Sequence, residues 1–205
     1  LGVFDPGGVL RRIEEDKITV MPGAPTIFQT MMDHPDFEKR DLSSLRLATT
    51  GATVIPVDLI RKMHEVIGID YVYSAYGLTE TCGVVSLCQK GDDFETIATT
   101  VGRALPETEV IMVDEDGNQV AAGEEGEIWV RGFNVMMGYL DDPKATADTI
   151  TEDGWLKTGD IGRQDERGYI RITDRKKDMI IVGGFNCYPA EVEQSLMLHD
   201  EIVDV

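Results

Sequence analysis

Hydrophobic and polar residues follow two different periods along this 205-residue chain, and the change falls near Gly91. Before it, short apolar runs alternate with segments in which apolar residues recur every three or four positions. In the segment 56–67, for example, Leu59, Ile60 and Met63 share one helical face. Strands that alternate with such helices predict a parallel sheet that binds ligands at the carboxyl ends of its strands.

Capping residues and apolar runs place the elements of this first part. Asp5 before Pro6 predicts a helix start with a side-chain cap. Further helices are predicted over 26–32 and 56–67, and strands over 18–21, 45–47 and 69–73. The first of these strands is expected to be short and buried.

After Gly91 the apolar residues alternate in twos, which is typical of antiparallel strands. Polar turns at 114–117 and 165–168 predict two β-hairpins. The predicted strands are 110–113, 119–120, 127–131, 161–164, 169–173 and 180–182, and the predicted helices are 143–150 and 189–197. A small antiparallel sheet or barrel is therefore expected, followed by the start of a third unit.

The amino-acid composition limits the kinds of molecule that this chain is expected to bind. The net charge is −19, with 42% hydrophobic and 28% charged residues, as in an acidic globular protein. This charge opposes binding to nucleic acid or anionic membranes, because that binding needs a basic surface. No apolar run reaches the roughly 20 residues of a membrane helix. Three cysteines without CxxC spacing predict neither disulfides nor zinc, so a reducing, cytoplasmic location is expected.

The string YGLTE, residues 76–80, follows the third predicted strand. Its glycine predicts a turn, after which the Thr79 hydroxyl is placed to meet a phosphate. The Glu80 carboxylate is placed to help hold Mg²⁺, a hard ion that prefers oxygen ligands. An ordinary turn and helix start would produce the same string, so the motif alone leaves both interpretations open.

Small residues follow the second predicted strand at Thr50, Gly51 and Ala52. They would let a flat base lie against the backbone, although an ordinary strand-to-helix turn explains them equally well. The Gly183-Gly184 pair allows either a close approach of another chain or a tight turn.

A carboxylate, a guanidinium and a polar joint lie close together later in the chain. The Asp160 carboxylate, in a predicted acidic loop with Thr158 and Gly159, can only accept hydrogen bonds and could take both hydroxyls of a ribose, although a solvated loop Asp is the alternative. Arg175 offers fixed donors to ribose or phosphate oxygens, and a surface salt bridge is its alternative. The charged run 174–178 would usually be a solvated face, and its place between two folding units adds a hinge as a second interpretation.

In this order, the strings resemble the adenylate-forming superfamily of acyl-CoA synthetases, luciferases and peptide-synthetase adenylation domains. The matching strings are TTGA from Thr49, YGLTE from Tyr76, GEIWVRG from Gly126, GYL from Gly138, DGWLKTGD from Asp153 and GYIRITDRKKDMIIVGGFNCYPAEVE from Gly168. Within the superfamily they look most like bacterial acyl-CoA ligases, including those that act on carboxylates from steroid breakdown.

The resemblance implies the fold class α/β plus β, in three parts. The first, residues 1–95, is part of a parallel-sheet α/β subdomain. The second, 96–176, is a small antiparallel β-barrel subdomain. The third, 177–205, is a hinge and the beginning of a small, truncated α+β lid domain.

The implied reaction has two steps, and its cosubstrates are ATP, coenzyme A and a small carboxylic acid, with Mg²⁺ as cofactor. ATP converts the carboxylate to an acyl-adenylate and releases pyrophosphate. The small domain then rotates, and the thiol of coenzyme A attacks the acyl-adenylate. The resemblance places this ligase in fatty acid and lipid metabolism.

The resemblance also implies roles for residues that match the family's strings. Gly51 and Ala52 would lie against adenine, while Ser74, Ala75 and Tyr76 would form a wall shared by adenine and the acyl group. The catalytic residues would be Thr79 at the phosphate, Glu80 at Mg²⁺ and Lys177 at the hinge. The remaining positions would be Asp160 and Arg175 at the ribose, and Gly183 and Gly184 along the pantetheine passage.

The chain departs from the family pattern in three ways. The family's Gly-rich Ser/Thr phosphate loop and its late catalytic lysine do not occur in it, and Ile181 stands where some relatives carry lysine. We therefore expect an inactive piece of a longer ligase, with exposed core surface that favours homo-oligomers or other association. The alternatives are an amino-acid or aryl-acid adenylation domain that loads a carrier protein, and a non-catalytic nucleotide-binding or interaction module. The former needs an acidic partner for an amine, and residues 71–75 contain none.

Overall fold

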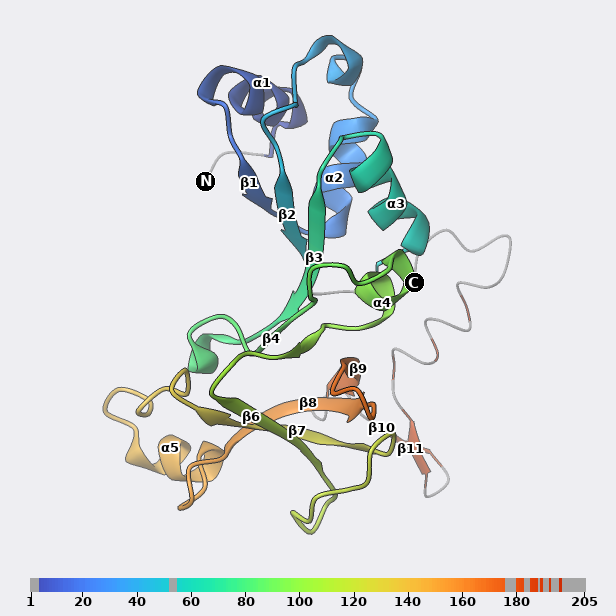
Figure 1. Ribbon diagram of the computed structural model, residues 1–205. Coiled ribbons are helices and arrows are strands. Elements are labelled where there is room, and N and C mark those ends of the chain that lie inside the picture. The colour runs from blue at the N-terminus through green and yellow to red at the C-terminus, as the bar shows by residue number, and fades with distance from the viewer. Residues whose placement is uncertain are drawn as a thin grey trace. The chain divides into compact units, whose positions relative to one another are not determined.

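The computed structural model describes residues 4–51 and 55–175, the backbone of 180–182 and 185–187, and the single residues Pro189, Val192 and Leu196. The chain divides into two compact units (Figure 1). Unit 1 comprises Leu1–Tyr76 and Ser86–Arg103, and unit 2 comprises Gly77–Val85 and Ala104–Val205. The three domains expected from the sequence, 1–95, 96–176 and 177–205, are not tested by this division and remain a prediction.

Unit 1 is built around a mixed five-stranded sheet with the order β1-β2-β3-β4-β5. β1, β2 and β3 are parallel, as predicted, whereas β4 runs antiparallel to β3. The elements are α1 (Pro6–Asp16), β1 (Val20–Pro22), α2 (Pro25–Met32), η1 (Phe37–Lys39), β2 (Leu47–Thr50), α3 (Val57–Glu65), β3 (Tyr71–Tyr76), β4 (Ser86–Leu87), α4 (Phe94–Thr99) and β5 (Arg103–Ala104).

Several local predictions for unit 1 need correction. The first strand is not buried, because Val20 is 43% exposed and β1 pairs with β2 at the end of the sheet order. β2 and β3 begin two residues later than expected and extend further, so Thr50 and Tyr76 are strand residues. Asp5 precedes α1 as expected, but it makes no side-chain capping hydrogen bond.

The apolar faces of the helices form the core of unit 1 against the sheet, and α2 and α3 lie beside the strands in Figure 1. Leu10 and Ile13 of α1, Phe28 of α2, and Ile60 and Met63 of α3 are fully buried. Burial of such side chains is the main driving force for folding of this unit. The three- and four-residue apolar spacing in the sequence therefore predicted the correct helix faces.

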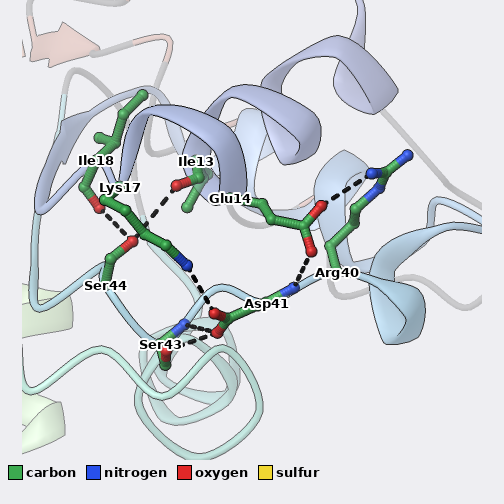
Figure 2. Close-up of polar contacts among 8 residues, drawn as sticks. All are labelled: Ile13, Glu14, Lys17, Ile18, Arg40, Asp41, Ser43 and Ser44. Carbon is green, nitrogen blue, oxygen red and sulfur yellow. Dashed lines mark hydrogen bonds and ion pairs between the residues drawn. The ribbon is translucent and has the colours of Figure 1, made fainter.

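A polar network ties the end of α1 to the segment 40–44 (Figure 2). The Glu14 carboxylate accepts hydrogen bonds from Arg40 Nη1 at 2.9 Å and from the Asp41 amide at 3.0 Å. The Asp41 carboxylate accepts from Lys17 Nζ at 2.8 Å and from the Ser43 hydroxyl and amide at 2.6 and 3.0 Å. The hydrogen bond from Lys17, followed by those from Ser43, holds the pKa of Asp41 well below its usual range.

Unit 2 contains a four-stranded antiparallel sheet with the order β6-β7-β8-β9, as the alternating pattern predicted. A separate antiparallel hairpin joins β10 to β11. The elements are η2 (Thr79–Thr81), β6 (Thr108–Val113), β7 (Glu125–Gly132), α5 (Pro143–Thr149), β8 (Leu156–Gln164), β9 (Ile170–Arg175), β10 (Ile180–Val182) and β11 (Phe185–Cys187).

The turns of unit 2 form where the polar clusters predicted them, but the predicted strand 119–120 is only an isolated bridge between Val113 and Gln119. Asp114 bonds to the backbone of the first turn, where its Oδ1 accepts from the Asn118 amide at 2.8 Å. Asp165 does the same in the second turn, where its Oδ1 accepts from the Tyr169 amide at 2.8 Å. Asp160, expected in a loop, instead lies inside β8.

The predicted helix 189–197 falls mostly outside the described residues. In the part of the chain that is described, no helix is both long and apolar enough to cross a membrane.

Candidate functional site

The site residues predicted in unit 1 gather at the carboxyl ends of two neighbouring parallel strands. Thr50, the last residue of β2, pairs with Ser74 of β3. Gly51 follows directly, and a Cβ at this position would lie 2.8 Å from the Ala75 carbonyl oxygen. The close approach requires glycine and brings Gly51, Ser74 and Ala75 together, with Tyr76 next along β3. Ala52, predicted to lie against adenine, is outside the described residues.

In unit 2, Thr79 and Glu80 lie in the short helix η2, after a turn that depends on Gly77. A Cβ on Gly77 would lie 2.1 Å from the Gly83 carbonyl oxygen. The buried Thr81 hydroxyl donates to the Leu78 carbonyl oxygen at 3.0 Å and accepts from the Leu78 amide at 3.2 Å. The turn thereby leaves Thr79 exposed and Glu80 half-buried.

Glu80 borders a cavity of about 330 Å³ within unit 2. The cavity is lined by residues from η2 and the position before it, from β7, β8 and α5, and from the segment before α5: Leu78, Glu80, Glu127, Tyr139, Asp148, Thr149, Leu156, Lys157, Thr158 and Gly159. Its acidic side chains and a single lysine can attract a cation together with groups that the cation bridges. The cavity and the predicted metal-binding carboxylate thus coincide.

The Glu80 carboxylate accepts a hydrogen bond from the Tyr139 hydroxyl at 2.8 Å. This hydrogen bond, followed by burial and by the negative charge of Glu80, raises the pKa of Tyr139, whereas a hydrogen bond with Thr149 lowers it. Tyr139 therefore stays protonated at neutral pH and acts as the donor. No role was predicted for Tyr139 from the sequence, because it lies 59 positions after Glu80 and no periodic pattern links the two residues.

The residues present fit Mg²⁺ in one specific way. In the described part of the chain, no cluster of three or more His, Cys, Asp or Glu side chains could hold a metal ion. Mg²⁺ is commonly held by one or two carboxylates together with substrate phosphates and water. Glu80 at the cavity suits that arrangement, with the remaining ligands supplied by a bound nucleotide.

Asp160 and Arg175, which are 15 residues apart in the sequence, are direct partners on β8 and β9. Arg175 Nε lies 3.4 Å from Asp160 Oδ1, and the two side chains are 63% and 13% exposed. The two predicted ribose-binding residues are therefore adjacent on one sheet.

The backbone just before Asp160 forms a β-bulge, which is held by side-chain hydrogen bonds. The Thr158 hydroxyl donates to the Ile128 carbonyl oxygen at 2.7 Å and accepts from the Asp160 amide at 3.1 Å. Glu127, only 8% exposed, accepts from the Gly159 amide at 3.1 Å. The strand registers shift beside these residues. Glu127 was not recognised in the sequence, where it is an ordinary residue of the GEIWVRG string.

The remaining predicted site residues, Lys177, Gly183 and Gly184, lie outside the described residues.

The structure describes the surroundings of two cysteine side chains, Cys82 and Cys88. Cys82 is exposed directly after η2, and Cys88 is buried. Burial raises the pKa of the Cys88 thiol to about 11.

Comparison with known proteins agrees with this arrangement of strings. Residues 2–140 match the family model described as "AMP-binding enzyme". The chain belongs to this family. Over 204 residues it is 52% identical to 3-[(3aS,4S,7aS)-7a-methyl-1,5-dioxo-octahydro-1H-inden-4-yl]propanoyl:CoA ligase of Rhodococcus jostii, and the match covers 100% of this chain and 38% of the relative.

The chain is also similar to a second ligase sequence and to a solved ligase structure. A long-chain-fatty-acid–CoA ligase of Salmonella typhimurium is 40% identical, with 98% of this chain and 35% of the relative covered. The O-succinylbenzoate coenzyme A synthetase of Bacillus subtilis, solved in complex with AMP, is 32% identical with a TM-score of 0.84, covering 98% of this chain and 40% of that structure. The chain therefore spans less than half the length of these relatives, all of which bear names of acid–CoA ligases.

Proposed function

We propose that the chain is part of an ATP-dependent carboxylate–CoA ligase that forms an acyl-adenylate and then a thioester with coenzyme A. The observation that carries the proposal is the identity of 52% to a CoA ligase along the whole chain. The geometry supports it, because Glu80 borders a cavity and Asp160 pairs with Arg175.

Each residue has a distinct task in this proposal. The exposed Thr79 hydroxyl meets a phosphate, and Glu80 holds Mg²⁺, which when bound neutralises charge on the phosphates. Asp160 accepts hydrogen bonds from both ribose hydroxyls, and Arg175 donates to the ribose. Gly51 offers an open backbone for adenine, beside the wall formed by Ser74, Ala75 and Tyr76.

The parts that move belong to the same proposal. The four-stranded sheet of unit 2 is part of a β-barrel subdomain, and the residues after Arg175 begin a lid. The lid turns at Lys177, and Gly183 and Gly184 line the path of pantetheine. In the cytoplasm, the lid would close once for adenylation and again, in another orientation, for thioester formation.

The acid is proposed to be a propanoate on a fused-ring skeleton, because the relative that is 52% identical is named for such a substrate. A fatty acid is the second candidate, on the basis of the relative that is 40% identical. We expect the 205-residue chain by itself to bind AMP weakly and to be inactive.

ATP–pyrophosphate exchange by the full-length protein tests the proposal. The panel comprises a fused-ring propanoate, a long-chain fatty acid, an aryl acid and an amino acid, and Asp160→Ala serves as the impaired variant. Exchange that depends on one of the carboxylates and is lost in Asp160→Ala is expected. Exchange with none of them, or full exchange by Asp160→Ala, would contradict the proposal.

A further inference from the structure

A single loop holds both the backbone and the side chain of Glu80. The Met136 amide donates to the Glu80 carbonyl oxygen at 2.8 Å, and the Tyr139 hydroxyl donates to Glu80 Oε1 at 2.8 Å. The same loop is attached to the end of the turn, where Asn134 Nδ2 donates to the Val84 carbonyl oxygen at 2.8 Å. Asn134 is 4% exposed. The position of Glu80 is therefore determined by residues more than fifty positions later in the sequence.

The position of Tyr139 is determined in turn by α5. Its amide donates to Thr146 Oγ1 at 2.9 Å, and that hydroxyl donates to the Asp142 carbonyl oxygen at 2.9 Å. Gly138 before it has a φ of +149°, and a Cβ there would lie 2.8 Å from the Thr146 side chain. The glycine and tyrosine of the GYL string thus have separate roles: one lets the chain approach α5, and the other reaches Glu80.

We propose that Tyr139 is a positioning residue that orients the Glu80 carboxylate for Mg²⁺. The inference rests on the proposed function, since it requires Glu80 to be a metal ligand. Tyr139 binds Oε1 and fixes the plane of the carboxylate, which leaves Oε2 to face the cation. Hydrogen bonds of this kind determine the geometry of metal-binding carboxylates, and their loss weakens metal affinity by about 10- to 100-fold.

Two roles of Tyr139, positioning Glu80 and touching a substrate directly, can be told apart by kinetics. A tyrosine that bound the acid or the nucleotide itself would change the KM of that substrate at every metal concentration. A tyrosine that acts through Glu80 changes the metal requirement, and saturating metal restores the substrate KM values. The two roles therefore predict different kinetic results for Tyr139→Phe.

The experiment uses the full-length protein with Tyr139→Phe, and with Tyr169→Phe as a matched control in the same unit. The Mg²⁺ dependence of ATP–pyrophosphate exchange gives one reading. Mn²⁺ binding in the presence of a non-hydrolysable ATP analogue, followed by electron paramagnetic resonance, gives a second that does not need turnover. We expect Tyr139→Phe to raise both half-saturating metal concentrations about tenfold and Tyr169→Phe to leave them unchanged.

Substitutions at Thr146 test the contact that supports Tyr139. Thr146→Val removes the hydroxyl that accepts from the Tyr139 amide and should raise the metal requirement by about threefold, whereas Thr146→Ser keeps the hydroxyl and should not. Near-equal metal requirements in Tyr139→Phe and the unsubstituted protein would overturn the inference, provided that Glu80→Gln raises them. If Glu80→Gln has no effect, or if the unsubstituted protein shows no exchange, the assignment of Glu80 or the proposed function itself is wrong, and this inference is wrong with it.

Discussion

The polar network of unit 1 and the cavity of unit 2 use carboxylates in opposite ways. Asp41 accepts three hydrogen bonds, two of them from Ser43, only two residues away. Within the described residues, Glu80 accepts one, from a tyrosine 59 positions later, and it borders a cavity. A carboxylate that accepts three hydrogen bonds, two of them from a residue two positions away, is suited to stabilising the fold. A carboxylate that accepts one hydrogen bond and borders a cavity is better suited to binding a ligand. The number and origin of the donors, rather than the density of charge, distinguish the two regions.

The sharpest test of this comparison exchanges the two carboxylates for amides. Glu80→Gln should lower ATP–pyrophosphate exchange about 100-fold, because a neutral amide would hold Mg²⁺ more weakly and less charge on the phosphates would be neutralised, and should leave the Tm nearly unchanged. Asp41→Asn should lower the Tm and leave the exchange rate intact. Loss of exchange in Asp41→Asn, or loss of Tm in Glu80→Gln, would show that the two regions do not differ as described.

The turn that carries Glu80 should be sensitive to one methyl group. Gly77→Ala would place a Cβ 2.1 Å from the Gly83 carbonyl oxygen. We expect it to destabilise the fold by about 3 kcal/mol, as for other overpacked sites, measured by urea unfolding. Gly23→Ala is the control, since its Cβ would meet side chains no closer than 3.4 Å. Equal stability of the two variants would contradict this account of the turn.

The bulge before Asp160 offers a smaller effect. Glu127→Gln keeps the shape of the side chain but removes the negative charge that strengthens its hydrogen bond with the Gly159 amide. The orientation of Asp160 should loosen, and AMP binding measured by calorimetry should weaken about fivefold. Glu125→Gln, on the same strand but paired with Arg163, should leave AMP affinity unchanged. An equal loss in both variants would indicate a general effect of charge.

The smallest effect concerns pH. The pKa of Asp41 lies below its unfolded value of about 3.9, so its contribution to stability is present above pH 4 and is lost as the pH falls toward the folded pKa. In urea unfolding between pH 5 and 2.5, the unsubstituted protein should lose stability more steeply than Asp41→Asn. Parallel curves would show that Asp41 does not stabilise the fold through its charge.

Local signals predicted most of the fold. Apolar spacing placed α2 and α3, alternation placed β7, and the aspartates of the polar clusters placed the two turns, although the predicted strand 119–120 is only an isolated bridge. The sequence did not show β4 or α4, because a two-residue strand and a six-residue helix are too short to establish a period. It also placed Asp160 in a loop, since Gly159 and polar neighbours are typical of turns, whereas pairing with β9 and contacts from β7 keep the segment extended.

The residues of the candidate site also differ in whether a local sequence signal points to them. Glu80, Asp160 and Arg175 could be proposed from the sequence because each belongs to a string with a chemical interpretation, and their roles stay predictions. Tyr139 and Glu127 were missed because their importance lies in contacts with residues 59 and 32 positions away. A motif can therefore propose which residues bind a ligand, whereas the contacts that would position those residues are visible only in the folded chain.

The different burial of Cys82 and Cys88 offers a practical handle on the site. The buried thiol, with its pKa near 11, stays protonated and inert toward maleimides at neutral pH. Cys82 is exposed two residues after Glu80. In a Cys187→Ser background, a fluorophore attached to Cys82 would therefore sit two positions from Glu80, which borders the cavity, and its emission would test for nucleotide and metal binding in real time.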